Sequence, residues 1–185
     1  QMICHYCGAM QDAVTVCPEC GANLIERGAH LFCPNRDGCK KQIVMRLSHF
    51  AGREAMDIET FSEKTAEQLV NLNLIQEADQ LYALEKEQLA GLDRFGEKKA
   101  ENLIQAIEKS KTPKLSAFIY AIGIPNVGVK TARDLADRFG TIDALRAADA
   151  ETLTGMDDVG EIVAESVRGF FADPANRRLV DALLA

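Results

Sequence analysis

The sequence contains no tryptophan, and aromatic residues make up only 6% of its 185 positions. This scarcity argues against a broad aromatic platform on which the bases of single-stranded nucleic acid would stack. No apolar run approaches the roughly 18 residues of a membrane-spanning helix, and no basic segment leads into an apolar one as in a signal peptide. We therefore expect a cytoplasmic protein without a membrane partner.

Recognisable catalytic groupings are also missing. No paired carboxylates and no serine–histidine or cysteine–histidine set stand in an arrangement typical of an enzyme. We expect no catalytic residue in this chain. With 47% hydrophobic and 26% charged residues, the chain should still fold around a core as one or two domains.

Basic residues are fewer than acidic ones, and the formal net charge is −7. Residues 1–50 hold five Lys and Arg against four Asp and Glu, or +1, which leaves 16 against 24, or −8, for residues 51–185. DNA-binding domains usually present a basic face, so overall charge argues against a nucleic-acid partner. Any phosphate contact beyond residue 50 must depend on local geometry.

Cysteine is confined to the first 39 residues, which hold all six. Four of them form two short-range pairs, Cys17 with Cys20 and Cys33 with Cys39, and twelve residues separate the pairs. This spacing is typical of a metal site in a reducing compartment and not of a disulfide framework. Two such pairs can close a tetrahedral zinc site, and four protein ligands leave no position for water, so the zinc would be structural.

A second ligand set is compatible with the spacing. Cys4 and Cys7 end nine residues before Cys17, so the first two C-x2-C pairs would also make a compact zinc ribbon. One ion takes four ligands, so Cys4 and Cys7 are spare, displace the last pair, or bind in another chain. In either case we expect Gly21 and Gly38 to let the backbone turn around the sulfur atoms.

A repeat of about 32 residues follows Lys40, where the apolar pattern is helical and no strand pattern is found. Each copy has an apolar residue, two variable residues, a second apolar residue, glycine and, four positions later, alanine. The three glycines stand 32 positions apart, and a fainter copy 34 positions earlier has serine instead. The copies begin at Ile58, Leu92, Ile124 and Met156, with Ser62, Gly96, Gly128 and Gly160 at the glycine position and Ala66, Ala100, Ala132 and Ala164 at the alanine position.

We interpret each copy as a helix, a tight hairpin and a second helix that begins just after the glycine. The glycine would let a partner approach the backbone, and the free N–H groups at the helix start would form an anion site aided by the helix dipole. Basic residues in that first turn oppose the dipole, and a bound phosphate would explain them. They are Lys98, Lys99, Lys130 and Arg133.

Taken in order, several segments make the chain resemble one family. They are the Cys17/Cys20/Cys33/Cys39 spacing, the stretch Leu47–Glu59, the stretch Ala78–Leu84, the stretch Phe95–Leu103 and the stretch Ala121–Gly128. Over residues 17–185 the chain resembles the C-terminal half of bacterial NAD-dependent DNA ligases, specifically their zinc finger and helix-hairpin-helix domain.

This resemblance implies a mainly α fold, with a Cys4 zinc finger in residues 1–45 and a DNA-binding domain of four helix-hairpin-helix repeats in residues 46–185. It favours Cys17, Cys20, Cys33 and Cys39 as the ligands of a structural zinc ion. The parent ligase uses NAD and Mg²⁺ in upstream domains, and its K-x-D-G motif is absent from these residues. We therefore expect the chain alone to bind neither NAD nor Mg²⁺ and to be inactive.

The implied function is clamping of duplex DNA through its backbone, without reading of sequence, by a ligase that seals nicks in replication and repair. The implied partners are nicked duplex DNA and the remaining ligase domains. The expected DNA contacts are Arg94, Gly96, Lys98, Lys99, Asn126, Gly128, Lys130 and Gly160.

The chain departs from the family at the first glycine of the Gly-apolar-Gly hairpin turn. Thr60, Arg94, Asn126 and Asp158 take that place. We expect the first copy, with Ser62, to be structural, and Asp158 to repel a phosphate unless its side chain points away. The acidic balance better fits a rival hypothesis, a zinc-stabilised scaffold for protein interactions that binds DNA weakly or not at all.

Overall fold

The computed structural model describes residues 2–3, 10–11 and 14–185. Its strands form two small antiparallel sheets, β1 (Met2–Ile3) with β2 (Met10–Gln11) and β3 (Ile25–Arg27) with β4 (His30–Phe32). Ile25 lies opposite Phe32, and Gly28 in the connecting turn has a φ of +64°. Glycine adopts this left-handed conformation without steric cost, which permits the two-residue hairpin.

Residues 40–185 are all described and contain helices and loops but no strand, as the sequence predicts. The helices are α1 (Lys40–Ala51), α2 (Glu63–Asn71), the 3₁₀ helix η1 (Ala78–Ala83), α3 (Lys86–Ala90), α4 (Gly96–Lys109), α5 (Leu115–Ala121), α6 (Val129–Phe139), α7 (Ile142–Arg146), α8 (Ala150–Thr154), α9 (Glu161–Ala172) and α10 (Pro174–Leu184).

The predicted repeat is confirmed as four helical hairpins. The pairs α1 with α2, α3 with α4, α5 with α6 and α8 with α9 each pack together. The alanine of each copy is buried, with Ala66, Ala100 and Ala132 at 0% exposure and Ala164 at 2%. A methyl group at this position lets the helices of a hairpin approach closely, because a larger side chain would push them apart.

The same turn joins the two helices of every hairpin. Its fourth residue donates a backbone hydrogen bond of 3.1–3.3 Å to the first: Phe61 to Ile58, Phe95 to Leu92, Val127 to Ile124 and Val159 to Met156. Its third residue has a positive φ in each copy: 68° at Thr60, 60° at Arg94, 63° at Asn126 and 65° at Asp158. This combination is that of a type II turn, in which glycine is preferred at the third position.

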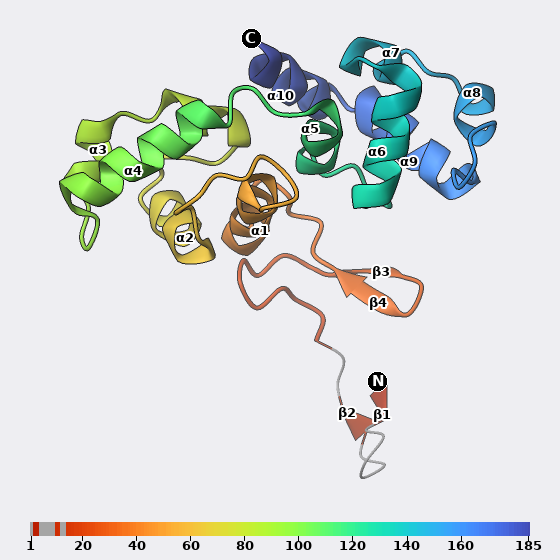
Figure 1. Ribbon diagram of the computed structural model, residues 1–185. Helices are drawn as coiled ribbons and strands as arrows, with labels where there is room; N and C mark the ends of the chain where they lie inside the picture. Colours follow the sequence, from red (N-terminus) through yellow and green to blue (C-terminus); the bar gives the residue numbers. More distant parts are fainter. Residues whose placement is uncertain (1, 4–9, 12–13) are drawn as a thin grey trace.

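The hairpins are arranged around α1 (Figure 1). Helices α2, α3 and α4 lie on one side of it and α5 to α9 on the other, and α5 packs against α1. The His49 Nε2 atom of α1 lies 2.7 Å from the carbonyl oxygen of Tyr120 in α5, which joins the two halves by a hydrogen bond. The C-terminal helix α10 contacts both α9 and η1, so the last helix also bridges the halves.

Helix α1 belongs to both proposed domains. It begins directly after Cys39, its N-cap residue, and it is the first helix of the first hairpin. The boundary that the sequence suggests between residues 45 and 46 therefore falls inside one continuous helix. None of the helices in the described part of the chain combines the length and apolar character needed to cross a membrane.

Candidate metal centre and nucleic-acid interface

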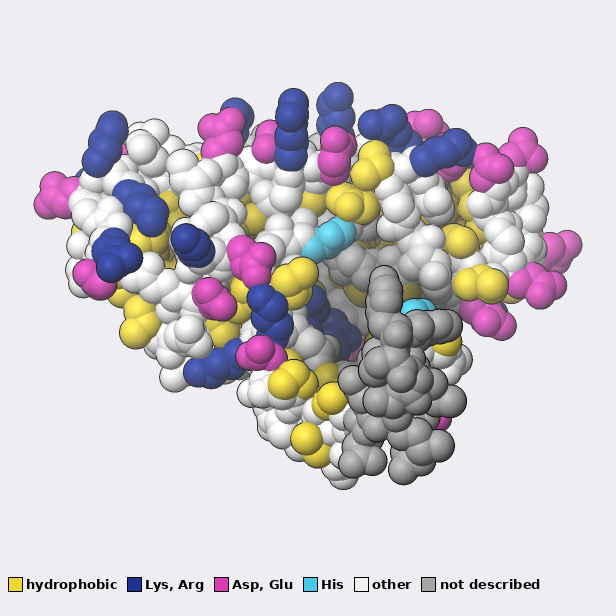
Figure 2. Space-filling model, turned by 90° about the horizontal axis from the view of Figure 1, so that it is seen from below, with side chains coloured by type: hydrophobic (Ala, Val, Ile, Leu, Met, Phe, Trp, Pro, Cys, Tyr) yellow, Lys and Arg dark blue, Asp and Glu magenta, His cyan; other side chains and the backbone are white. Residues whose placement is uncertain are grey.

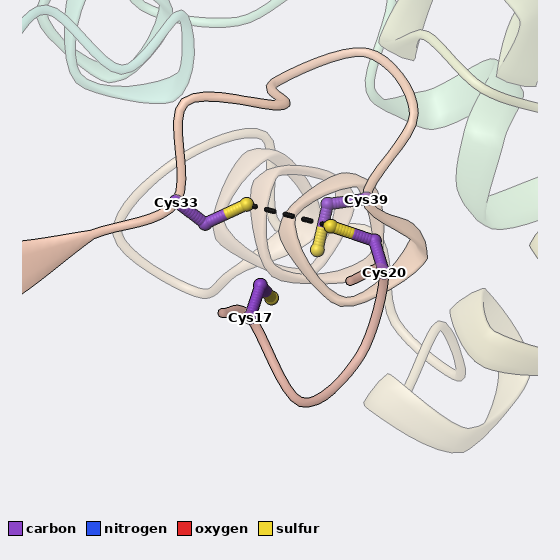
Figure 3. Close-up of side chains that lie close together, drawn as sticks. All are labelled: Cys17, Cys20, Cys33 and Cys39. Atoms are coloured by element: carbon purple, nitrogen blue, oxygen red, sulfur yellow. Dashed lines mark hydrogen bonds between the residues drawn. The ribbon is translucent and has the colours of Figure 1, made fainter. Parts of the chain in front are cut away.

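Four cysteines meet between the β3–β4 hairpin and the start of α1 (Figure 3). The Sγ atoms of Cys17, Cys20, Cys33 and Cys39 all lie within 4.8 Å of one another, and those of Cys20 and Cys33 are 3.6 Å apart. Sulfur ligands at about 2.3 Å from a tetrahedral metal ion would lie about 3.8 Å from each other. The cluster therefore fits one ion with four thiolate ligands. Cys4 and Cys7, the competing pair, lie outside the described residues.

Backbone hydrogen bonds fold the chain around the first pair of sulfur atoms. The Gly21 N–H donates to the Cys17 carbonyl at 2.8 Å, and the Cys17 N–H donates to the Ala22 carbonyl at 2.8 Å. Gly21 has a φ of +74°, so the expectation that glycine is needed for this turn is correct. The left-handed conformation is costly for residues with a Cβ atom.

Gly38 is required for a different reason. It is absent from the positive-φ residues, but a Cβ atom there would lie 2.6 Å from the Asn35 Oδ1 atom. That oxygen accepts a hydrogen bond of 3.1 Å from the Gly38 N–H, and the Asn35 carbonyl accepts one of 3.0 Å from Cys39. A side chain at residue 38 would therefore disturb the loop that presents Cys39.

Cys20 and Cys33 differ in acidity. A hydrogen bond from the Ala22 backbone lowers the pKa of Cys20 to about 7, whereas burial raises the pKa of Cys33 to about 11. Cys39 is 1% exposed and is the N-cap residue of α1. Cys17 and Cys39 are buried and Cys20 and Cys33 half-buried, so a cation bound here would offset the charge of thiolate ligands that lie close together.

The starts of the second helices differ among the hairpins. At α2 the Ser62 hydroxyl accepts a hydrogen bond of 3.2 Å from the Thr65 N–H, so the helix is capped by its own side chain. Gly128 and Gly160 provide no side-chain cap to α6 and α9, and the first backbone bonds to their carbonyls come from Ala132 and Ala164. The N–H groups of residues 129–131 and 161–163 therefore have no acceptor within their helices.

The glycines of the second and third copies are not equivalent, although the sequence aligns them. Gly96 has a φ of +65°, whereas Gly128 has an extended backbone with φ −88° and ψ −175°, which any residue adopts. A side chain would therefore strain the backbone at Gly96 but not at Gly128. At Gly96, Gly128 and Gly160 a Cβ atom would have no atom within 4 Å, so each glycine faces open space.

The basic residues predicted for the second hairpin are accessible. The Lys99 Nζ atom lies 4.4 Å from the centre of the Phe95 ring, a cation–π contact that fixes its direction. Lys98 is exposed, and Arg94 is 92% exposed with its Nε atom 3.9 Å from an Asp93 oxygen. Such an exposed pair contributes little and can be exchanged for a phosphate.

Lys130 in the third hairpin already has carboxylate partners. Its Nζ atom lies 2.6 Å from Asp158 Oδ2 and 3.1 Å from Asp134 Oδ2. The bond with Asp158 raises the pKa of Lys130 and lowers that of Asp158. We attributed the basic residue at this helix start to a phosphate partner, but the two carboxylates are a sufficient explanation. The Asp158 side chain points toward Lys130.

A second contact joins the third and fourth hairpins. The Asn126 amide donates a hydrogen bond of 2.8 Å to the Ser166 hydroxyl. Together with the Lys130–Asp158 pair, it fixes the two turns to each other, which sequence reasoning missed. The sequence contained one sign of these contacts: Asp158 stands 32 residues after Asn126 and so occupies the same place in the next hairpin.

The hairpins also differ in charge. From 156 to 166 the fourth copy has four acidic residues, Asp157, Asp158, Glu161 and Glu165, and no Lys or Arg. In Figure 2 acidic side chains line the edge of the molecule over α8 and α9, whereas Lys and Arg are numerous on the opposite side, over α2 to α4. The start of α9 is therefore a poorer place for an anion than the starts of α4 and α6.

Comparison with known proteins agrees with the hairpin architecture. A family model described as "SAM-like Helix-hairpin-helix tandem" matches residues 53–109, and one described as "Helix-hairpin-helix motif" matches residues 117–180. The chain is 52% identical over 170 residues to a DNA ligase of Clostridium perfringens, which covers 92% of this chain and 26% of that protein.

Other relatives give the same result. A DNA ligase of Alkaliphilus metalliredigens is 52% identical over 169 residues, or 91% of this chain and 26% of the relative. A DNA ligase of Clostridium tetani is 57% identical over 155 residues, or 84% and 23%. The chain therefore spans about a quarter of the length of the curated relatives that it matches.

Proposed function

Because this chain belongs to the DNA ligase family, as a segment of about a quarter of its curated relatives, we propose that it binds the backbone of duplex DNA without reading sequence. It acts as the DNA-clamping part of an NAD-dependent ligase that seals nicks. The observation that carries this proposal is the pair of helix starts without a side-chain cap, at α4, which begins at Gly96, and at α6, which begins after Gly128; both glycines face open space.

The second and third hairpins supply the main phosphate contacts. At each, free backbone N–H groups and the positive end of the helix dipole favour an oxygen anion, and the missing Cβ lets it approach. Lys98, Lys99 and Arg94 add attraction at the second hairpin, and Lys130 adds it at the third once Asp158 releases it. The turn with Asn126 holds the third hairpin in place. Gly160 provides a backbone contact of lower affinity, because its surroundings are acidic.

The metal centre holds Zn²⁺ through Cys17, Cys20, Cys33 and Cys39. The ion fixes the loop before α1 and leaves no coordination position for a substrate, so its role is structural. The chemistry of ligation, with NAD and Mg²⁺, belongs to other parts of the parent enzyme. This chain alone should form no covalent adduct with AMP when it is incubated with NAD⁺.

Gly128→Val tests the proposal. The extended backbone and the open space at residue 128 accommodate a side chain, so the variant should fold and yet lose duplex binding at least tenfold, since the valine blocks the phosphate. Binding is measured by fluorescence anisotropy with a labelled nicked duplex at several salt concentrations, and folding by circular dichroism. Ser62→Val, at the same position of the first hairpin, is the matched control and should bind as the parent does.

A salt series separates the two candidate functions. Phosphate contacts release counterions, so DNA affinity should fall steeply as salt rises. The rival hypothesis of a protein-interaction scaffold draws support from the acidic fourth hairpin and predicts weak DNA binding that Gly128→Val leaves unchanged. That result would remove the DNA-clamping proposal.

A further inference from the structure

A groove of about 950 Å³ lies between the two halves of the molecule. Its walls are the loop after α1, the end of α4 with the α4–α5 connection, and the facing sides of α5 and α6 (Figure 1). Of the basic residues that the sequence analysis attributes to a bound phosphate, Arg133 lines this groove. It reaches Val129, the first residue of α6, and so begins directly beside Gly128 of the third hairpin.

The rim of this groove is basic. Four exposed cationic side chains line it, from three separate segments: Arg53, Lys109, Lys114 and Arg133. None of the four has a carboxylate oxygen within 4.0 Å in the described part of the chain, although Glu54, Asp57 and Asp137 also line the groove. Four cations against three anions give +1, in a chain whose net charge is −7.

Small side chains form the floor of the groove. Ser116 and Ala117 of α5 and Ala136 of α6 are half-buried and small, so this part of the lining projects little into the groove. The side of the groove that α6 forms is about 16 Å long from Val129 to Gly140, since a helix advances about 1.5 Å per residue along its axis. Phosphates of one strand follow each other at about 3.4 Å along the axis of a duplex, so several could lie along this wall.

We propose that the groove is a second DNA site, which holds the sugar-phosphate backbone of one strand after that strand leaves the third hairpin. The proposal rests on the proposed function and extends it, because the third hairpin supplies the first phosphate contact. Arg133 bonds the phosphates next to the hairpin, and Arg53, Lys109 and Lys114 bond those beyond it. The groove thus joins the contacts of the two halves into one continuous backbone track.

The test compares two arginines of the same helix in the whole chain. Arg133 and Arg138 both lie on α6, both are exposed, and neither has an ion-pair partner among the described residues, but only Arg133 lines the groove. The double variant Arg53→Ala/Arg133→Ala should bind a labelled nicked duplex about tenfold more weakly and lower the salt slope by about two. The control Arg53→Ala/Arg138→Ala should show about half of these changes in binding free energy and in salt slope.

A footprint distinguishes a groove contact from a general loss of charge. Hydroxyl-radical cleavage of the bound duplex should show a shortened protected segment on one strand for the double variant and not for Arg177→Ala, an exposed arginine of α10 outside the groove. Equal affinity, slope and footprint in the double variant and the parent, while Gly128→Val abolishes binding, would overturn the groove site alone. A parent chain that does not bind the duplex overturns the proposed function and the groove site together.

Discussion

Four of the six described non-glycine residues with a positive φ occupy the same place in the hairpin turns, where the backbone conformation favours glycine. Thr60, Arg94, Asn126 and Asp158 all have φ values between 60° and 68° at the third position of their hairpin turns. Asparagine and aspartate tolerate this region, but a β-branched residue such as Thr60 is a true outlier there. The conformation is kept because the surrounding hairpin fixes it, with Ile58 and Phe61 of the same turn both buried.

Thr60→Gly should therefore stabilise the chain. Relief of about 1–2 kcal/mol of left-handed strain exceeds the extra chain entropy of glycine, for a net gain of about 0.5–1 kcal/mol in the free energy of unfolding. Urea denaturation followed by circular dichroism measures the change. Asn73→Gly is the control, because Asn73 also has a positive φ of 56° but asparagine is less strained in this conformation. This variant should not raise the free energy of unfolding. A loss at Thr60 would contradict this account of the turn.

A second prediction at this scale concerns the metal ligands. The purified chain should carry about one zinc ion. Cys33→Ser should release the ion and unfold the segment around the four cysteines, because structural zinc contributes folding free energy on the order of 10 kcal/mol. Cys4→Ser should retain the ion. Metal content by atomic emission and thermal unfolding are the measurements, and zinc loss in Cys4→Ser but not in Cys33→Ser would instead support the ligand set that contains Cys4 and Cys7.

At the scale of elements, the third and fourth hairpins act on each other. Lys130 of α6 reaches across to Asp158 in the turn before α9, and Asn126 in the turn before α6 reaches Ser166 in α9. Asp158 in the acidic turn thus forms an ion pair with Lys130, the cation near the start of α6. A phosphate bound there must displace the Asp158 carboxylate from Lys130.

Asp158→Asn should consequently strengthen DNA binding. The change leaves Lys130 only its 3.1 Å contact with Asp134 and removes a repelling charge, while asparagine keeps the positive φ of the turn. We expect about fivefold higher affinity at low salt and a salt slope steeper by about one. The control is Asp157→Asn, which removes the same charge from the neighbouring exposed residue but has no contact with Lys130 in the described structure. Equal gains would mean that only net charge matters.

At the scale of the whole molecule, the last helix is attached to the metal-binding loop. Arg36 lies between Cys33 and Cys39, and its Nη2 atom donates a hydrogen bond of 2.8 Å to the Asn176 Oδ1 atom of α10. Asn176 is 5% exposed and donates through its own amide to the Phe170 carbonyl at 3.1 Å. The loop and α10 are therefore joined through one buried amide, and an ion pair of 3.7 Å between Arg36 and Asp173 adds a second contact.

Asn176→Ala should destabilise the chain by about 1–3 kcal/mol, because it leaves the buried Phe170 carbonyl without this hydrogen bond and removes the bond from Arg36. It should also uncouple α10 from the metal centre. In the parent chain, removal of the metal with a chelator should speed amide hydrogen exchange in α10, whereas in the variant exchange should already be fast and should change little. Arg177→Ala, on the exposed side of the same helix, should behave as the parent, and an unchanged exchange rate in parent α10 would refute the link.

Much of this protein follows from local sequence. The cysteine spacing allowed two ligand sets, and the resemblance to the ligase family favoured the one whose sulfur atoms the structure brings together, Cys17, Cys20, Cys33 and Cys39. The 32-residue repeat predicted the four hairpins, because the buried alanine and apolar positions recur once in every hairpin and the turn residues stand between them. The uncapped starts of α6 and α9 follow from the absence of a side chain at Gly128 and Gly160, as the capped start of α2 follows from the Ser62 hydroxyl.

The tertiary structure decided the rest, because contacts between residues far apart in the chain depend on how hairpins pack. Gly96 and Gly128 align in sequence, yet only Gly96 is left-handed. Lys130 has a helix-start position in the sequence and two carboxylate partners in space, one of them 28 residues away. The groove with Arg53 and Arg133 combines side chains 80 positions apart, so no repeat or motif could reveal it, and only the packing of the two halves around α1 brings them together.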